Sequence, residues 1–408
     1  MGMNFNIVQK PKKDDDEDEL MDEDELEVEV EDTKTKSFDP KKKMVKFMGI
    51  IMIATLALLV LLFIVSLFSN HKSKYSYSEV EKIMKSAAVS YFKDHPDYLP
   101  QEDGSIVEVD SSNLIAEGKM KDLSEYLDES VQCTGAVQVE RSGSEYLYTP
   151  YLSCGDSYST VELYKKVVSE DNIVTTGYGL YSSNGGYVFR GENVNNYVQL
   201  DKSLWRIVKV TANNNIVLVH ADGIQYTQPW DDRYNKENAY ESGINQYSAS
   251  RIKEYLDKVY TNPEEKDGED ILSKADKSKI VSFNLCTGKR LSSSEKMDNS
   301  EECSEVYKDQ KLGLLTISDY ITASIDPNCK NVNTKSCKNY NYLLMKTDWW
   351  LVTGNKEDTA TVFQVVHNGV VKAVEASNYA TVRPVIYLNS KVLYKSGKGT
   401  LEKPYKVR

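Results

Sequence analysis

Histidine is scarce in this sequence, with four residues among 408. None of them stands at metal-ligand spacing from another histidine or from a cysteine. The chain also lacks a glycine-rich phosphate loop, a Gly-x-Ser-x-Gly elbow and a His-Glu-x-x-His helix. We therefore expect no metal site, no cofactor and no catalytic residues, and we predict that the protein is not an enzyme.

An excess of basic residues is missing as well. The net charge is −12, and residues 1–69 supply half of it with 15 acidic and 9 basic side chains. Nucleic-acid binding depends on a basic surface that neutralises phosphates. Neither part of the chain has the required basic excess, so we expect no nucleic-acid partner.

One long uncharged run stands out from Phe47 to Phe68, with 22 residues that are mostly apolar. Roughly 20 such residues span a bilayer core as a helix. A cleaved signal peptide would begin near the N-terminus and have a shorter apolar region. We therefore predict a single-pass membrane anchor at 41–70 that contacts the lipid bilayer through residues 47–68.

The orientation of this anchor follows from charge and cysteine. Four lysines precede the run, and the positive-inside rule keeps them in the cytoplasm. All cysteines follow it, and their placement on one side fits an oxidising exterior, where disulfides persist. Together these features place the N-terminus in the cytoplasm and the C-terminal region outside the cell. The lysines are Lys41, Lys42, Lys43 and Lys46.

The segment before the anchor is strongly acidic. Residues Asp14 to Asp32 contain 14 acidic side chains and no basic one. Such a run repels itself and buries nothing, so we predict a disordered cytoplasmic tail at 1–40. It is either a solvated spacer or a docking tail for a basic cytoplasmic partner.

A small domain is predicted at 75–165. Ser78 and Glu81 form a capping box, and an apolar stripe follows from Val80 to Phe92 at helical spacing, which His95-Pro96 ends. A short helix around Leu114 stops at Gly118. Two strands, 131–140 and 145–154, then form a hairpin around residues 141–144, which brings Cys133 opposite Cys154 for a disulfide.

These residues resemble the pilin and pseudopilin-like modules of bacterial surface proteins. The resemblance rests on the anchor that continues into an amphipathic helix, on Cys133-Thr134-Gly135-Ala136-Val137, and on Tyr148 to Cys154. It departs from pilins because Gly49 is not followed by the acidic residue that pilin processing needs. The resemblance therefore implies a pilin-like stalk rather than an assembled pilus.

A larger, β-rich domain is predicted at 178–408, after a Gly/Ser/Asn-rich boundary stretch at 177–186. A helix at about 250–260 and a short helix capped by Ser318 interrupt the strands. The nearest-neighbour cysteine pairs are Cys286 with Cys303 and Cys329 with Cys337, although four cysteines allow three connectivities. The predicted strands are 187–189, 197–200, 205–210, 216–219, 312–315, 349–352, 360–366, 370–374 and 382–388.

This domain resembles a widespread module of bacterial surface proteins. Its entry residues are Phe189-Arg190-Gly191-Glu192 and Leu204-Trp205-Arg206-Ile207, and its closing residues include Thr381 to Ile386. The module is similar to folds of the C-type-lectin-like and formylglycine-generating-enzyme-like class. The resemblance implies a lectin-like head but no particular reaction.

One polar-aromatic cluster is the candidate ligand site. Trp230, Asp231, Asp232 and Arg233 stand near Asp222 in the sequence, and exposed aromatic rings beside carboxylates can stack on sugars or hold a cation. The alternative is a turn at Asp222 with a loop anchored by a buried tryptophan.

Four further residues, two tryptophans and two arginines, are predicted to have structural roles. Trp349 and Trp350 face opposite ways in a strand, so we expect one in the core and the other at the surface or covering the sheet. Arg206 and Arg383 lie in apolar strands and are predicted to make structural hydrogen bonds.

We thus expect an α+β chain with one transmembrane helix, a helix-plus-hairpin domain and a mixed, β-rich, lectin-like domain. The favoured function is a non-catalytic cell-surface binding or adhesion protein with a glycan or protein ligand. One alternative is a scaffold of a cell-envelope complex that docks cytoplasmic partners by its acidic tail. A second is an ectoenzyme, of which a free thiol among the last four cysteines would be a sign.

Overall fold

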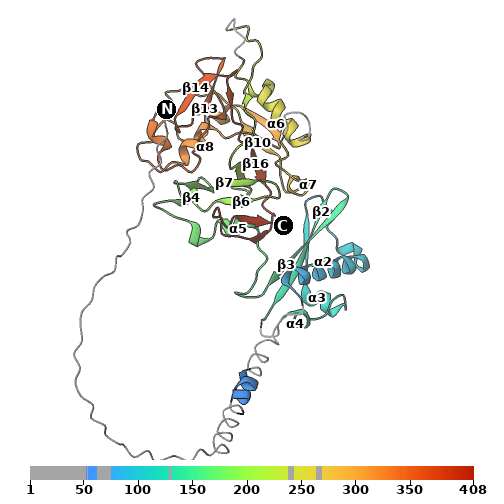
Figure 1. The fold of residues 1–408 in the computed structure, drawn as a ribbon. Coiled ribbons are helices and arrows are strands. Elements are labelled where there is room, and N and C mark those ends of the chain that lie inside the picture. The colour runs from blue at the N-terminus through green and yellow to red at the C-terminus, as the bar shows by residue number, and fades with distance from the viewer. Residues whose placement is uncertain (1–51, 53, 62–74, 128–130, 238–242, 263–268) are drawn as a thin grey trace, which may run out of the picture. The chain divides into compact units, whose positions relative to one another are not determined.

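The computed structural model describes residues 52, 54–61, 75–127, 131–237, 243–262 and 269–408 (Figure 1). The chain divides into two units, Met1–Lys72 and Ser73–Arg408. In the first unit, Met52 and residues 54–61 are helical, and large apolar side chains such as Leu56 and Leu59 are exposed.

The predicted anchor and acidic tail fall mostly on residues outside this description. Among the described residues, none of the helices combines the length and the apolar character that crossing a membrane requires. The run from Phe47 to Phe68 and the tail at 1–40 therefore stay predictions.

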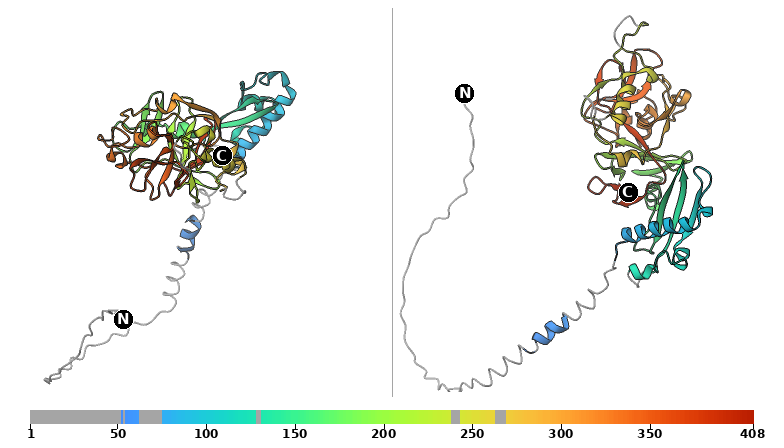
Figure 2. Two further views of the ribbon diagram at one scale, coloured as in Figure 1. Left: turned by 90° about the horizontal axis from the view of Figure 1, so that it is seen from above. Right: turned by 90° about the vertical axis from the view of Figure 1, so that its right-hand side faces the viewer.

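The second unit begins with a helix packed on a small antiparallel sheet, which Figure 2 shows in its right-hand view. The sheet has the strand order β1-β2-β3, and its first strand was not predicted. Thr134 pairs with Ser153 in the hairpin register, so Cys133 and Cys154 lie opposite each other and form a disulfide, as predicted. The elements are α2 (Tyr77–Asp94), β1 (Ile106–Asp110), α3 (Ser111–Ala116), α4 (Leu123–Tyr126), β2 (Thr134–Ser142) and β3 (Glu145–Ser153).

The start of α2 differs from the prediction. Ser76, and not Ser78, is the N-cap, and it forms the capping box with Glu79. Glu81 is instead buried, where it accepts hydrogen bonds from Tyr158 Oη at 2.9 Å, from Thr160 Oγ1 and from the Arg408 guanidinium. A carboxylate can be buried at this position because these donors replace its water.

The rest of α2 matches the helical pattern. Val80, Met84, Ala87, Ala88 and Phe92 are buried, and His95 is the C-cap. The five buried residues of α2 form a separate hydrophobic core with Leu114 of α3 and apolar residues of the three strands.

A second core extends from Leu163 to Tyr405 and belongs to the β-rich part. Its largest sheet has the strand order β16-β8-β7-β6-β18-β17, and the hairpin of β4 and β5 joins this sheet at β7. All pairs in it are antiparallel except β18 with β6. The strands are β4 (Gly179–Ser183), β5 (Gly186–Arg190), β6 (Tyr197–Gln199), β7 (Leu204–Val210), β8 (Ile216–His220), β16 (Val385–Leu388), β17 (Tyr394–Ser396) and β18 (Tyr405–Val407).

Smaller sheets and helices complete the second core. Helix α6 buries Ile252, Tyr255, Leu256 and Val259, as its sequence period predicts. Three strands form the order β12-β13-β14, and two further pairs are β10-β11 and β15-β9. The bounds are α5 (Leu163–Val167), β9 (Gln228–Pro229), α6 (Arg251–Thr261), α7 (Lys274–Lys277), β10 (Phe283–Cys286), β11 (Val306–Gln310), α8 (Ile317–Thr322), β12 (Trp349–Gly354), β13 (Thr361–Val365), β14 (Val371–Glu375) and β15 (Tyr379–Ala380).

Several predictions for this part were wrong in detail. The stretch 177–186 is not a boundary, because it contains β4 and the turn into β5. Residues 312–315 form only an isolated bridge, from Gly313 to Val385. Trp349 and Trp350 are both fully buried, so neither lies at the surface, and Trp350 donates its indole N–H to the Gln228 carbonyl at 2.7 Å.

The remaining cysteine pairs are Cys286–Cys303 and Cys329–Cys337, the connectivity that locality favours. Arg206 and Arg383 have the predicted structural role. Arg383 donates to the carbonyls of His220, Leu343 and Ala221, and Arg206 donates to Asn196 and to a carbonyl.

Candidate functional site

The predicted ligand cluster is largely structural. Trp230 is fully buried and donates to the Leu351 carbonyl at 3.1 Å, so its ring offers no surface to a sugar. Asp231 is also buried, and it accepts hydrogen bonds from Arg233 Nε at 2.7 Å and from the Ile244 N–H at 2.9 Å. The loop anchored by a buried tryptophan is therefore the reading that the structure favours.

Arg233 is half-buried, and Asp232 and Asp222 are the exposed members of that cluster. Asp232 pairs with Arg251 at 3.3 Å, and Asp222 lies at the turn before Gly223. None of the five residues lines the cleft described next.

A cleft of about 540 Å³ lies on one face of the large sheet. We call it the sheet cleft. One wall consists of β5, of residues 208–212 and of the turn at Ser183 and Asn184, and the other consists of α8 and residues 297–299. Clefts of a few hundred Å³ with apolar walls and a few convergent polar groups are the usual form of small-ligand sites.

Strand register decides which side chains share the cleft face. Val188 of β5 is paired with Lys209 of β7, which is paired in turn with Val217 of β8. Paired residues of adjacent strands lie on the same face of a sheet. The lysine therefore stands in an apolar row between two valines.

Lys209 meets Asp319 of α8 in the sheet cleft. The distance from Nζ to Oδ1 is 2.7 Å, and the side chains are 23% and 13% exposed. Burial opposes both charges, but their mutual attraction outweighs it, raising the pKa of the Lys209 amine and lowering the pKa of the Asp319 carboxyl. The pair also borders a smaller cavity of about 40 Å³ on its other side, lined by Phe283, Leu314 and Tyr387 among others.

Three side chains, those of Thr316, Thr353 and Glu302, accept hydrogen bonds from backbone N–H groups in the first turn of α8. Thr316, and not the predicted Ser318, is the N-cap, and its backbone N–H and hydroxyl both donate to Asp319 Oδ2, at 3.1 and 2.9 Å. The Ile317 N–H donates to Thr353 Oγ1, and the Ser318 N–H donates to Glu302 Oε1, each at 3.1 Å. These bonds satisfy the orphan donors of the helix end.

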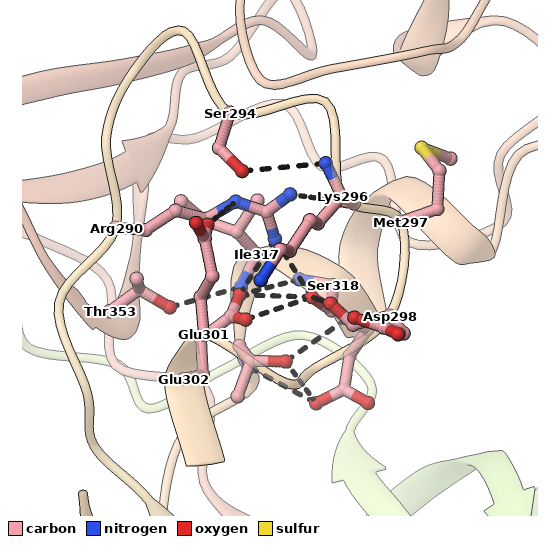
Figure 3. A network of polar contacts seen from close by, with 12 residues as sticks. Arg290, Ser294, Lys296, Met297, Asp298, Glu301, Glu302, Ile317, Ser318 and Thr353 are labelled. Atoms are coloured by element: carbon pink, nitrogen blue, oxygen red, sulfur yellow. Dashed lines mark hydrogen bonds and ion pairs between the residues drawn. The ribbon is translucent and has the colours of Figure 1, made fainter. Parts of the chain in front are cut away.

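Ser318 belongs to a buried polar network instead (Figure 3). Glu302 and Arg290 are both fully buried and pair at 3.1 Å, and the Ser318 hydroxyl lies within 3.0 Å of both groups. Arg290 also pairs with Glu301 at 3.3 Å. A buried charge is tolerated when it is paired and hydrogen-bonded in this way.

This network holds the wall of the sheet cleft that consists of α8 and residues 297–299. Arg290 donates to the carbonyl of Lys296, next to that wall, and Ser318 donates to the carbonyl of Asp298 at 2.7 Å (Figure 3). Thr322 also donates to the Met297 carbonyl, at 3.4 Å. The Cys286–Cys303 disulfide closes the same segment. A stretch with little regular structure thus becomes a defined surface.

Arg190 ties the far end of α8 to β5. Its Nε donates to the Thr322 carbonyl at 3.0 Å and its Nη2 to the Ser324 carbonyl at 2.9 Å, and its guanidinium lies 5.1 Å from the centre of the Tyr181 ring. The sequence did not indicate either arginine as a site residue: Arg190 contacts carbonyls 132 and 134 positions away, and Arg290 contacts residues 6 to 28 positions away in a stretch with little regular structure.

Metal ligation has no support in the part of the chain that the structure describes, where no group of three or more His, Cys, Asp or Glu side chains is placed to hold an ion. Comparisons of the chain with known protein families, with characterised proteins and with solved structures find no match. The chemistry of the site therefore has to be argued from its own residues.

Proposed function

We propose that the chain is a membrane-anchored cell-surface protein whose outer part, residues 75–408, binds a ligand in the sheet cleft. The cleft is the observation that carries this proposal. One wall is apolar around Val188, the other wall is held by the Arg290 network, and the volume suits a saccharide unit or a short peptide segment.

Two other features support the proposal, one for a position outside the cell and one for the membrane anchor. The three disulfides lie beyond residue 130, and disulfides persist in oxidising compartments. In the first unit, the helical residues around Leu56 and Leu59 leave large apolar side chains exposed, as lipid contact requires. In this proposal the part with the smaller core, up to Cys154, acts as a stalk, and the part with the larger core, from Leu163 on, acts as the binding head.

Ligand arrays test the proposal. Full-length protein in nanodiscs is applied to glycan and peptide arrays, and each hit is measured again with Met297→Trp. Met297 lines the sheet cleft and is 36% exposed, so the larger ring fills the space and should weaken binding by about tenfold or more.

Leu291→Trp is the matched control. Leu291 is also 36% exposed and is absent from the lining of the sheet cleft. It should bind as the wild type does. Blank arrays, or equal losses in both variants, would contradict a ligand site in this cleft.

A further inference from the structure

We propose that Lys209 and Asp319 condense to an amide bond that covalently joins β7 to α8. The two residues are 110 positions apart in the sequence, yet Nζ lies 2.7 Å from Oδ1. Lysine amines and aspartate carboxyls form a stable amide when water is lost between them. This inference is independent of any ligand in the sheet cleft.

The two oxygens of Asp319 are already divided between two tasks. Oδ1 faces the lysine amine, whereas Oδ2 accepts the N–H and the hydroxyl of Thr316. Donors aimed at an oxygen on which negative charge develops stabilise the tetrahedral intermediate of acyl transfer. Thr316 therefore holds the oxygen that remains in the product, and leaves free the one that departs.

The step balances without an oxidant, a reductant or a second reactant. A proton passes from Nζ to Oδ1 along their hydrogen bond, which gives a neutral amine and a carboxylic acid. The amine nitrogen attacks Cγ, and the electron pair of the C=O bond moves to Oδ2. A second proton moves from nitrogen to Oδ1, the C–Oδ1 bond breaks, and Oδ1 leaves as water.

The surroundings impose a desolvation cost on the ion pair, which its mutual attraction offsets and which the amide does not carry. Lys209 lies between Val188 and Val217 in the sheet, and cavities border the pair on both sides. A pair of charges in such a site pays a desolvation cost that a neutral amide avoids. Fixed contact also replaces the entropy of a bimolecular encounter, an advantage of about 10⁵–10⁸ M in effective concentration. The sheet cleft gives the released water a way out.

Among the described residues, the other lysine–carboxylate pairs lack this combination of short distance and burial; Lys279 and Asp276, for example, are both largely buried but lie 3.9 Å apart. Lys165 lies 2.9 Å from Glu162, but its side chain is 54% exposed. Bulk water solvates the lysine ammonium there, although the Glu162 side chain is only 13% exposed, and this favours the charged amine over the neutral nucleophile. Lys165 and Glu162 therefore serve as an internal control that should stay unlinked.

Mass spectrometry of the full-length protein purified from membranes tests the proposal. After reduction of the disulfides, the wild-type mass should be lower than the sequence mass by one water, about 18 Da. Trypsin should release residues 207–233 joined to residues 312–330, with no cleavage after Lys209. Fragmentation should place the link at Lys209 and Asp319.

Lys209→Arg is the matched variant. Its guanidinium keeps the positive charge beside Asp319 but is a poor nucleophile, so both the mass deficit and the joined peptide should disappear. If this variant does not fold, the wild-type peptide map alone decides. A full sequence mass after prolonged incubation, or a loss of water at Asp319 without the joined peptide, would overturn the proposal.

Discussion

The two hydrophobic cores of residues 75–408 bury different kinds of polar group. Among the described residues between Tyr75 and Cys154, Glu81 is the buried charge, and regular structure surrounds it. The larger core encloses Asp231, Arg290, Glu302 and Arg383. In the first case a helix on a sheet makes the core, whereas in the second case charges hold long irregular segments in place.

This difference shows how the sheet cleft is built. Apolar packing alone orders strands and helices, since their backbone groups are already paired. The segment 287–301 has little regular structure, so its carbonyls are bound by Arg290 and Ser318 instead. The part of the molecule with the most buried charge is therefore the part that forms the candidate site.

Glu302→Gln should produce the largest effect. Removing one partner of a buried ion pair leaves Arg290 without its compensating charge, which typically costs about 3–5 kcal/mol. Urea unfolding with a probe for the larger core measures the loss. Glu254→Gln, at an exposed position of α6, should change the free energy of unfolding by less than about 0.5 kcal/mol. Equal small effects in both variants would contradict a structural role for the network.

The second-largest effect should be a loss of stability at acidic pH in the part with the larger core, which contains His220. Burial, and then the nearby Arg383, lower the pKa of His220 from 6.5 to about 4. The unfolded chain takes up a proton near pH 6.5 and the folded chain does not, so His220 contributes full stability above pH 6.5. This contribution falls as the pH drops toward 4, by about 3 kcal/mol in all.

The comparison with His220→Gln isolates this group. Between pH 7.5 and pH 5, the stability of the wild type relative to the variant should fall by about 2 kcal/mol, as measured by chemical unfolding at each pH. A constant difference across this range would show that His220 does not stay neutral in the fold.

The smallest expected effect concerns the helix of the smaller core. Ser76→Ala removes the N-cap of α2 and should lower stability by about 1 kcal/mol. Ser78→Ala, two residues later on the exposed side of the helix, should cost less than about 0.5 kcal/mol. Thermal unfolding compares the two, and the reverse order would favour the cap first predicted at Ser78.

The sequence predicts the regular elements well, because their patterns are local. The helix predicted at about 250–260 corresponds to α6, and the strands predicted at 205–210 and 216–219 correspond to β7 and β8. Asn214, between these two strands, has the positive φ that a tight turn needs. The caps at Ser76 and Thr316 had the same local signal, since each is followed three residues later by an acid. In both cases the prediction named a serine two residues later, Ser78 or Ser318, as the cap.

The sheet cleft could not be predicted in this way. Its walls come from four segments spread between residues 183 and 323, and Lys209 meets Asp319 only through the fold. Trp230 shows the opposite error, because an aromatic residue beside carboxylates looks like a surface site until its burial is known. Composition identifies which groups are present, but the arrangement of distant segments decides which of them meet.

Membrane topology tests most directly whether the cleft-bearing part lies outside the cell. Single cysteines are introduced at Ser37, in the predicted tail, and at Tyr379, which is 66% exposed in β15. Intact cells are treated with a membrane-impermeant maleimide, and the wild type, whose six cysteines are paired, gives the blank. We expect Tyr379→Cys to react in intact cells and Ser37→Cys to react only after permeabilisation. Labelling of Ser37→Cys in intact cells, or of Tyr379→Cys only after permeabilisation, would contradict the proposed surface protein.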